Sequence, residues 1–147
     1  MIRIGLKTPL DAVPEIAGVG FDCLELPLRD VAALSESEFA ELTEYLACLN
    51  VRVGAASDLM PDGLRVNGPA VSAQAQHDYL SLAFARANAL GADIAAFDAP
   101  KARAVPAGFD FALARRQTGN FLRIAQGHAA QAKLHIAVMN YRRAECN

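Results

Sequence analysis

The sequence of 147 residues contains no tryptophan, and only 20% of its residues are charged. Because 53% of the residues are hydrophobic, the composition argues against a disordered chain, which combines high charge with low hydrophobicity. No apolar run reaches the roughly 18 residues that a membrane-spanning helix needs, and the first ten residues lack the apolar segment of a signal peptide. The composition therefore predicts one globular, cytoplasmic domain without a membrane partner.

Cysteine is also scarce, with Cys23, Cys48 and Cys146 as the three examples. Their number is odd and no two of them have the Cys-x-x-Cys spacing, which argues against a disulfide framework and against a zinc site. We expect the cysteines to serve as packing residues. His77 and His128 occur on predicted helices, where a histidine is more often a packing residue than a ligand.

Acidic side chains are rare in the last third of the chain. Residues 101–147 contain two acidic and eight basic side chains, whereas residues 1–100 contain fourteen acidic and six basic ones. The basic segment could serve an anionic ligand or nucleic acid, or it could be a solvated helix face or a surface for an acidic protein. Few aromatic residues accompany these bases, so a platform that stacks nucleic-acid bases is not expected.

Short apolar segments alternate with longer segments of helical periodicity. The pattern predicts an α/β fold of parallel βα units, because strands that alternate with helices form a parallel sheet. We expect a single domain over residues 1–147. The predicted strands are 2–6, 21–28, 51–56, 93–97 and 134–140. The predicted helices are about 11–19, 36–49 and 110–132, together with a helix that has His77 near its start and ends at Leu90.

Several residues mark where these elements begin and end. The segment from Ser35 to Glu38 has the pattern of a capping box, in which each residue caps a backbone N–H of the other. Asn50 and Gly91 follow two of the predicted helices, where a left-handed residue commonly ends a helix. Pro27 lacks a backbone N–H and is expected to close the second strand.

Polar residues gather at the carboxyl ends of the predicted strands, where parallel α/β folds place their sites. The loops 57–70 and 98–106 are rich in turn residues. The candidates are Glu25, Ser57, Asp58, Asp98, Lys101, Arg103, Asn140 and Glu145.

Two of these candidates allow alternative interpretations. Glu25 lies in an apolar segment, so it either faces a ligand or is neutralised by Lys7 or Arg52. The loop with Asp98, Lys101 and Arg103 either holds a phosphate or forms its own salt bridge. The Gly-x-Ser-x-Gly, phosphate-loop and Gly-x-Gly-x-x-Gly motifs are absent, so acyl transfer and ordinary nucleotide binding lack support.

Three segments, 21–28, 93–109 and 134–147, together resemble the sugar phosphate isomerase/epimerase family, whose members form a xylose isomerase-like TIM barrel. The second segment keeps the family's Arg-x-Val-Pro-x-Gly-Phe tail from Arg103 to Phe109. The third ends in an Arg-x-Glu-x-Asn pattern formed by Arg143, Glu145 and Asn147. The resemblance covers the first five of the eight strands of such a barrel, which implies a partial barrel.

The resemblance implies aldose–ketose isomerisation or epimerisation next to a carbonyl, assisted by Mn²⁺ or Mg²⁺. A carboxylate removes the proton, and the cation stabilises the resulting enediolate. The resemblance implies that Glu145, the one candidate catalytic residue, contacts the substrate. We expect other residues at the strand ends to bind the substrate, a sugar or a sugar phosphate. These are Glu25, Asp58, Asp98, Lys101, Arg103, Asn140 and Arg143.

The chain departs from the family at the glutamate of the fifth strand, which both binds the metal and acts as the base. That position is Met139, and a thioether is a poor ligand for a hard cation. We therefore expect no metal ligand within this chain and no catalysis by the chain alone. It is then either an enzyme part that a partner completes or a non-catalytic binding module derived from the family. An endonuclease IV-like DNA-repair role is a third alternative.

A sheet of five parallel strands has two unpaired edges and one uncovered face. We expect self-association, association with a second chain that carries the other half of the barrel, or a rearranged last strand.

Overall fold

A single parallel sheet organises the chain, of which a computed structural model describes residues 4–16 and 18–139. Within these residues the sheet has five strands, and their order across the sheet is their order along the chain. The strands are β1 (Gly5–Lys7), β2 (Cys23–Pro27), β3 (Val53–Ser57), β4 (Ile94–Phe97) and β5 (His135–Val138). Every neighbouring pair is parallel, which confirms the predicted α/β fold of βα units.

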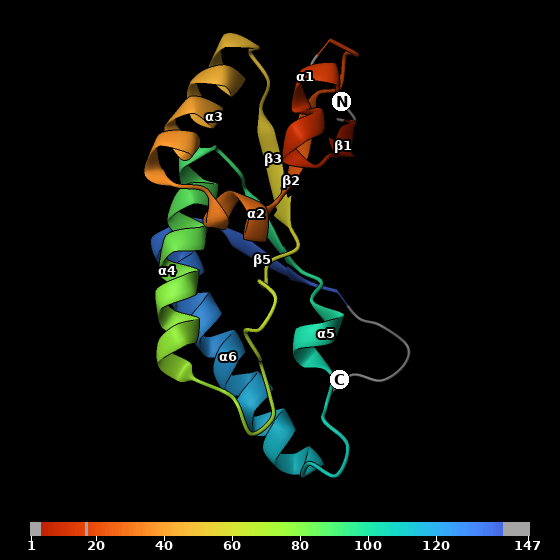
Figure 1. The fold of residues 1–147 in the computed structure, drawn as a ribbon, viewed down its shortest axis with the longest axis vertical. Helices are drawn as coiled ribbons and strands as arrows, with labels where there is room; N and C mark the ends of the chain where they lie inside the picture. Colours follow the sequence, from red (N-terminus) through yellow and green to blue (C-terminus); the bar gives the residue numbers. More distant parts are fainter. Residues whose placement is uncertain (1–3, 17, 140–147) are drawn as a thin grey trace.

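The three long helices lie along one face of this sheet (Figure 1). Parallel strands require a crossover connection between them, and these helices supply the connections from β2 to β5. The longest helix, α6, packs against α4, which also packs against α2. In chain order the helices are the 3₁₀ helix η1 (Leu10–Ala12), α1 (Val13–Ile16), α2 (Leu28–Ala33), α3 (Glu36–Cys48), α4 (Ala73–Ala89), α5 (Pro100–Arg103) and α6 (Phe111–Gln131). No described helix is long and apolar enough to cross a membrane.

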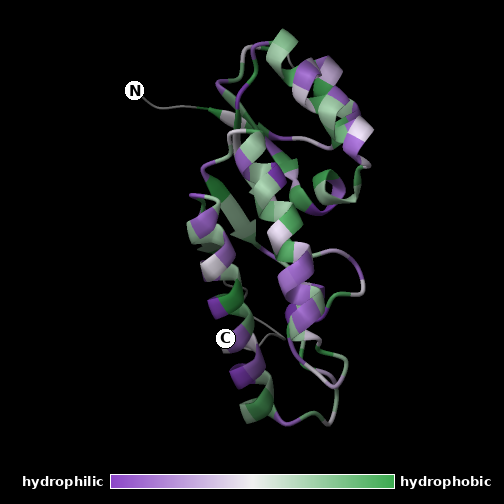
Figure 2. Cartoon of the chain, turned by 90° about the vertical axis from the view of Figure 1, so that its left-hand side faces the viewer, coloured by the Kyte–Doolittle hydropathy of each residue, from purple (hydrophilic) through white to green (hydrophobic). Residues whose placement is uncertain are grey.

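The core lies between the sheet and these helices. Leu24 and Leu26 of β2 and Phe97 of β4 are buried completely or almost completely. The ring centroids of Phe97 and Phe121 of α6 lie 4.9 Å apart, which joins the sheet to the longest helix. Figure 2 shows largely hydrophobic strands beside helices that carry both hydrophobic and hydrophilic residues, as expected for helices with one buried face.

The predicted capping residues are confirmed. At the start of α3, the Ser35 hydroxyl accepts from the Glu38 N–H, and the Glu38 carboxylate accepts from the Ser35 N–H at 2.7 Å. These hydrogen bonds lower the pKa of Glu38. Asn50 has a φ of 51° and Gly91 a φ of 82°, so both take the left-handed conformation predicted after α3 and α4.

Two short helices were not predicted. Residues 28–33 form α2 directly after Pro27, which ends β2 as predicted and stands at the helix N-cap. The loop prediction for residues 98–106 is wrong for Pro100–Arg103, which form α5. Proline is favoured in the first turn of a helix because no N–H is needed there. Such helices are too short for their hydrophobic residues to show a helical periodicity in the sequence.

The opposite face of the sheet is left open by the described residues. Strand pairing places Glu25, Ala55, Ile94 and His135 in one row across this face. Ile94 is 41% exposed and His135 is also exposed. Next to this row, Cys23 packs against Gly5 and Gly54, as predicted. A Cβ atom added at either glycine would lie only 2.9 Å from the Cys23 sulfur.

Candidate functional site

Three charged side chains meet at the carboxyl ends of β1, β3 and β4. Lys7 is the last residue of β1, and Asp58 and Asp98 directly follow β3 and β4. The Lys7 Nζ lies 3.0 Å from Asp58 Oδ2 and 3.9 Å from Asp98 Oδ2. Asp98 Oδ2 also accepts a hydrogen bond of 3.3 Å from the backbone N–H of Asp58. The cluster thus ties together three strands that are distant in sequence.

The cluster keeps Lys7 charged. Burial alone would lower the pKa of Lys7, but the hydrogen bond to Asp58 and the negative charges of Asp58, Asp98 and Glu25 outweigh it and raise this pKa. Lys7 therefore remains an ammonium at every physiological pH, and its single positive charge offsets part of the negative charge of the two aspartates.

Asp98 has an incomplete set of partners. Its residue surface is 8% exposed, and its Oδ1 atom has no hydrogen-bond partner among the described residues. The hydroxyl oxygen of Ser57 is also buried without a hydrogen-bond partner among the described residues. A buried carboxylate oxygen without a donor costs free energy unless a ligand or water satisfies it. Asp98, which also lines a neighbouring cavity, is therefore a candidate to accept a hydrogen bond from a ligand hydroxyl.

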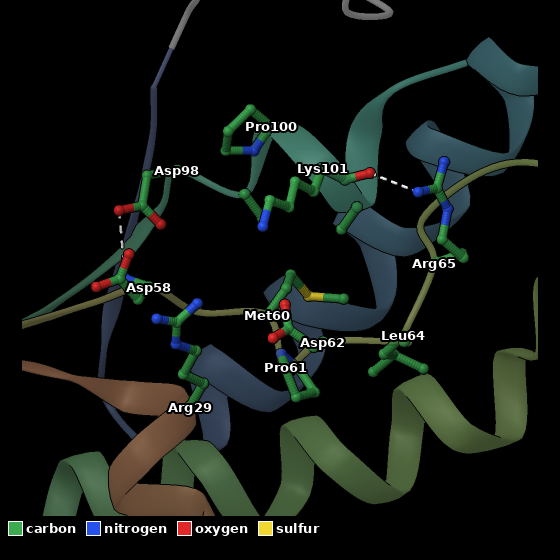
Figure 3. A pocket seen from close by; sticks show the side chains of 13 residues that line it. Arg29, Asp58, Met60, Pro61, Asp62, Leu64, Arg65, Asp98, Pro100 and Lys101 are labelled. Atoms are coloured by element: carbon green, nitrogen blue, oxygen red, sulfur yellow. Dashed lines mark hydrogen bonds between the residues drawn. The ribbon is translucent and has the colours of Figure 1, made fainter. Parts of the chain in front are cut away.

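A cavity of about 400 Å³ opens beside these aspartates. The loop after β3 forms one wall of the cavity, the segment from Asp98 to Ala102 forms another, and Arg29 of α2 contributes from below (Figure 3). The volume lies in the range of pockets that bind small molecules. Asp58, Asp98 and Lys101, all predicted as site residues, line this one cavity.

Hydrogen bonds between the two loops, and one from α4 to the loop after β3, hold the cavity walls in place. The Arg65 guanidinium donates to the carbonyl of Lys101 at 2.6 Å and to that of Ala104. The Asn67 amide donates to the Arg103 carbonyl at 2.6 Å and is fully buried. The Tyr79 hydroxyl donates to the Leu59 carbonyl at 2.6 Å, and its burial raises the pKa of Tyr79 well above its ordinary value. Such tethers favour a preformed site.

Arg103 does not line the cavity, although it was predicted to bind substrate beside Lys101. It is buried, donates to the carbonyl of Met139 at 2.6 Å and lies over the ring of Phe97 at 5.1 Å. These contacts connect α5 to the residue that follows β5. That Arg103 also binds substrate stays a prediction.

Arg29 takes a place in the cavity that the sequence did not predict. Its backbone N–H donates to the Asp58 carbonyl at 3.2 Å, which anchors the first turn of α2 beside the cavity. Arg29 was not predicted because the sequence pattern placed residue 28 in a strand and indicated no helix after it.

Glu25 lies next to the cluster but outside the cavity lining. Its strand register partner is Lys7, one of the two partners expected from the sequence. The other expected partner, Arg52, pairs with Asp93 instead. The charge of Glu25 helps to raise the pKa of Lys7, so the interpretation of Glu25 as a neutralised residue gains support.

The remaining predicted site residues belong to the last eight positions. Asn140, Arg143 and Glu145 lie outside the described residues, and so does Cys146. Met139, the position that matches the family's glutamate, is described and is 45% exposed.

The described residues do not fit the hard cation that the family resemblance implies. Mn²⁺ and Mg²⁺ prefer several oxygen ligands. Asp58 and Asp98 already face Lys7, and residues 4–16 and 18–139 contain no group of three or more His, Cys, Asp or Glu side chains that could hold a metal ion. The thioether of Met139 is too soft a ligand for these ions.

His77 and His128 form a pair on the helical side of the molecule. His77 Nδ1 and His128 Nε2 lie 3.0 Å apart, which joins α4 to α6. Burial and the charge of His77 lower the pKa of His128. His77 is exposed and His128 is half-buried, so the prediction that these histidines serve as packing residues stays a prediction.

Comparison with protein-family models gives no match, and no curated protein matches the sequence. Solved structures do match. A D-psicose 3-epimerase crystallised in the presence of D-fructose has a TM-score of 0.77 at 11% identity, over 98% of this chain and 54% of that chain. A D-allulose 3-epimerase from Methylomonas sp. in complex with D-allulose has a TM-score of 0.75 at 19% identity, over 97% and 53%. An AP endonuclease of family 2 from Brucella melitensis has a TM-score of 0.67 at 17% identity, over 94% and 55%.

These likenesses establish the fold. The chain spans about half the length of the structures that it matches. Its sheet and helices therefore correspond to about half of a TIM-barrel fold, which confirms the partial barrel that the sequence resemblance predicted.

Proposed function

We propose that this chain binds a small sugar at the carboxyl ends of its strands, as the sugar-binding part of an isomerase/epimerase-like barrel. The observation that carries the proposal is the buried Asp98, whose Oδ1 atom lacks a donor among the described residues at the edge of a cavity of about 400 Å³. Two similar folds belong to epimerases whose names or crystals include a ketohexose.

The chemistry of the cavity suits a polyol. A sugar hydroxyl both donates and accepts hydrogen bonds. The carboxylates of Asp58 and Asp98 offer acceptors, while Arg29 and Lys101 offer donors. Hydrogen bonds to charged groups are stronger than those between neutral groups, so a few of them suffice to orient a small ligand.

We further propose that the chain alone does not interconvert sugars. Proton transfer next to a carbonyl needs a positioned base, and in the family resemblance that base occupies the position of Met139. A methionine sulfur cannot accept the proton. The proposal thus favours a binding module over a complete enzyme, with the enzyme as the alternative if a partner supplies the missing groups.

A partner is also proposed for the open face of the sheet. A second copy of this chain, or a polypeptide that carries the other half of a barrel, would cover the exposed Ile94 and pair with β5, the edge strand among the described residues.

Asp98→Asn tests the binding proposal. Titration calorimetry with D-fructose and D-allulose should detect binding to the unchanged chain, and the amide should weaken it about tenfold, because a charge-assisted hydrogen bond is lost while the shape is kept. Asp11→Asn, an exposed residue outside the cavity, is the matched control and should bind normally. Equal affinity for the Asp98→Asn variant and the unchanged chain would contradict the proposal.

Met139→Glu tests the catalytic part. We expect the unchanged chain to leave a panel of ketoses and ketose phosphates unaltered in the presence of Mn²⁺. Interconversion by the unchanged chain would show that the binding-module interpretation is wrong. Activity that appears only in Met139→Glu would identify the missing carboxylate as the cause.

A second candidate function is DNA repair, which the likeness to the AP endonuclease favours. Exposed Arg115, Arg116 and Arg123 also line a shallow groove on α6. Phosphate contacts from such bases give affinity that falls steeply with salt. We expect little affinity for duplex DNA at low salt, and tight salt-dependent binding would favour this second candidate.

A further inference from the structure

We propose that the basic face of α6, formed by the exposed Arg115, Arg116 and Arg123, docks onto the acidic helix α3 of a second copy of this chain. In the resulting dimer the two copies lie antiparallel, so that each α3 contacts the α6 of the other copy. The contact uses neither the cavity beside Asp98 nor the open face of the sheet, and it therefore goes beyond the proposed function.

The first observation is a groove on the outer side of α6. Arg115, Arg116 and Arg123 line this groove, whose volume is about 590 Å³. Arg116 and Arg123 are seven positions apart, which places them two turns from each other on one side of the helix. α6 contains no acidic residue, and none of the three guanidinium groups forms an ion pair with a described residue. The three positive charges are therefore available to a partner.

The second observation is the opposite charge of α3, which contains four glutamates and no basic residue. Glu38 takes part in the capping box, and Glu36 pairs with Arg86. Glu41 and Glu44 are exposed, lie one turn apart and form no ion pair with any described residue. α3 therefore presents two carboxylates on one side that are available to a partner.

Each of the two helices also has an exposed aromatic ring next to its charges. Tyr45 of α3 is 39% exposed and lies one turn after Glu41, and Phe111 of α6 is 54% exposed and lies one turn before Arg115. Protein interfaces are enriched in aromatic and arginine side chains, and a guanidinium stacks favourably on a tyrosine ring. A contact between the helices therefore buries apolar surface as well, which matters because exposed ion pairs alone contribute little to stability.

The two charged helices lie too far apart to satisfy each other within one copy. α3 lies at one end of the long axis of the molecule, and the first turns of α6 lie at the other end (Figure 1). Two antiparallel copies bring the acidic end of each beside the basic end of the other, and the two contacts are then identical by two-fold symmetry. A closed dimer of this kind satisfies both helices at once.

A second copy fits the distribution of charge better than a nucleic acid does. The net charge of the chain is −2, and most acidic side chains lie within residues 1–100, so a polyanion would be repelled by much of the molecule. Two copies with so small a net charge repel each other weakly as whole molecules, while their opposite ends attract each other.

Sedimentation and size-exclusion chromatography with light scattering test the proposal on the full chain. We expect a dimer at low salt and protein concentrations up to about 0.1 mM. Its dissociation constant should rise about tenfold when the salt increases from about 0.1 M to about 1 M, because the Debye length then falls from about 10 Å to about 3 Å.

Two charge-reversal variants give a sharper test. Arg116→Glu with Arg123→Glu makes both helices acidic, and Glu41→Arg with Glu44→Arg makes both helices basic. Each variant alone should be monomeric, because like charges then face each other in both contacts. An equimolar mixture of the two variants should form the dimer again, because every α3 then meets an α6 of opposite charge. Recovery in the mixture also shows that both variants are folded.

Asp11→Arg with Glu15→Arg is the matched control, since it changes the net charge as much as the second variant does but lies outside both helices. This control should remain dimeric.

Four results would overturn the proposal. The first is an unchanged chain that is monomeric at low salt, and the second is a mixture of the two variants that stays monomeric. The third is a dimer that both charge variants retain and that Ile94→Asp dissociates, which would place the contact on the open face. The fourth is a monomeric chain that binds duplex DNA at low salt and loses this binding in Arg116→Glu with Arg123→Glu, which would assign the groove to nucleic acid.

Discussion

The two faces of the sheet differ although the same strands form both. On the helical face, Leu26 of β2 and Phe97 of β4 are fully buried. On the open face, Ile94 of β4 is 41% exposed, three residues from Phe97 in the same strand. Side chains alternate between the faces of a strand, so the difference comes from what covers each face and not from the composition of the strands.

The comparison separates stability from function. The helical face holds the packed core, including Phe97 against Phe121. The open face holds charged groups instead, with Lys7 and Glu25 as register partners near the cavity. Cavity residues follow the carboxyl ends of the strands, where the chain turns from the packed layer into the loops. The molecule therefore has its packed core on one face of the sheet and the charged groups of the cavity at the carboxyl end of the strands.

The largest expected effect separates the two faces directly. Phe97→Ala should lower the free energy of unfolding by about 3–5 kcal/mol, because it leaves a cavity in the core. Ile94→Ala, three residues away on the open face, should lower the free energy of unfolding by less than about 1 kcal/mol, since much of the Ile94 side chain already contacts water. Urea denaturation measures both. Equal losses would mean that the open face is covered in solution.

A smaller effect is expected on association. If a second copy covers the open face, Ile94→Asp should shift the chain toward the monomer, because a charge on that face opposes burial. Leu82→Asp is the matched control, since Leu82 is similarly exposed, at 42%, but lies on α4. Size-exclusion chromatography with light scattering reports the mass. A monomer at all concentrations for the unchanged chain would contradict self-association.

The smallest effect concerns the histidine pair of the helical layer. The folded state lowers the pKa of His128, so the unfolded state takes up the proton more readily. The contribution to stability is therefore complete above pH 6.5, the unfolded value, and is lost as the pH falls through the lower folded pKa. His128→Gln should flatten the decline of the melting temperature between about pH 7 and pH 5. An unchanged decline would assign it to other groups.

Much of the fold could be predicted because its signals are local. The hydroxyl of Ser35 and the carboxylate of Glu38 cap one helix by contacts three residues apart, and the left-handed Asn50 and Gly91 end two others. The alternation of predicted strands and helices then indicated a parallel sheet. The short helices α2 and α5 were missed because four to six residues show no period.

The site was predicted in part. Asp58, Asp98 and Lys101 were identified because they follow strands, and parallel strands end at one edge. The same rule did not predict that the side chain of Arg103 lies over the Phe97 ring and outside the lining of this cavity. It also overlooked Arg29, which reaches the cavity from a helix that the sequence did not reveal. A position directly after a strand predicts the end of the sheet at which a residue lies, but not the direction of its side chain.

The sequence by itself determined the order of the elements, most of their caps and the likeness to half of a barrel, because these depend on neighbours along the chain. The tertiary structure decided which charges meet. Lys7 and Asp98 are 91 positions apart and yet face each other, and Arg29 faces Lys101. Such pairings depend on how strands align and how helices pack, so they arise only when hydrophobic burial has brought the layers together.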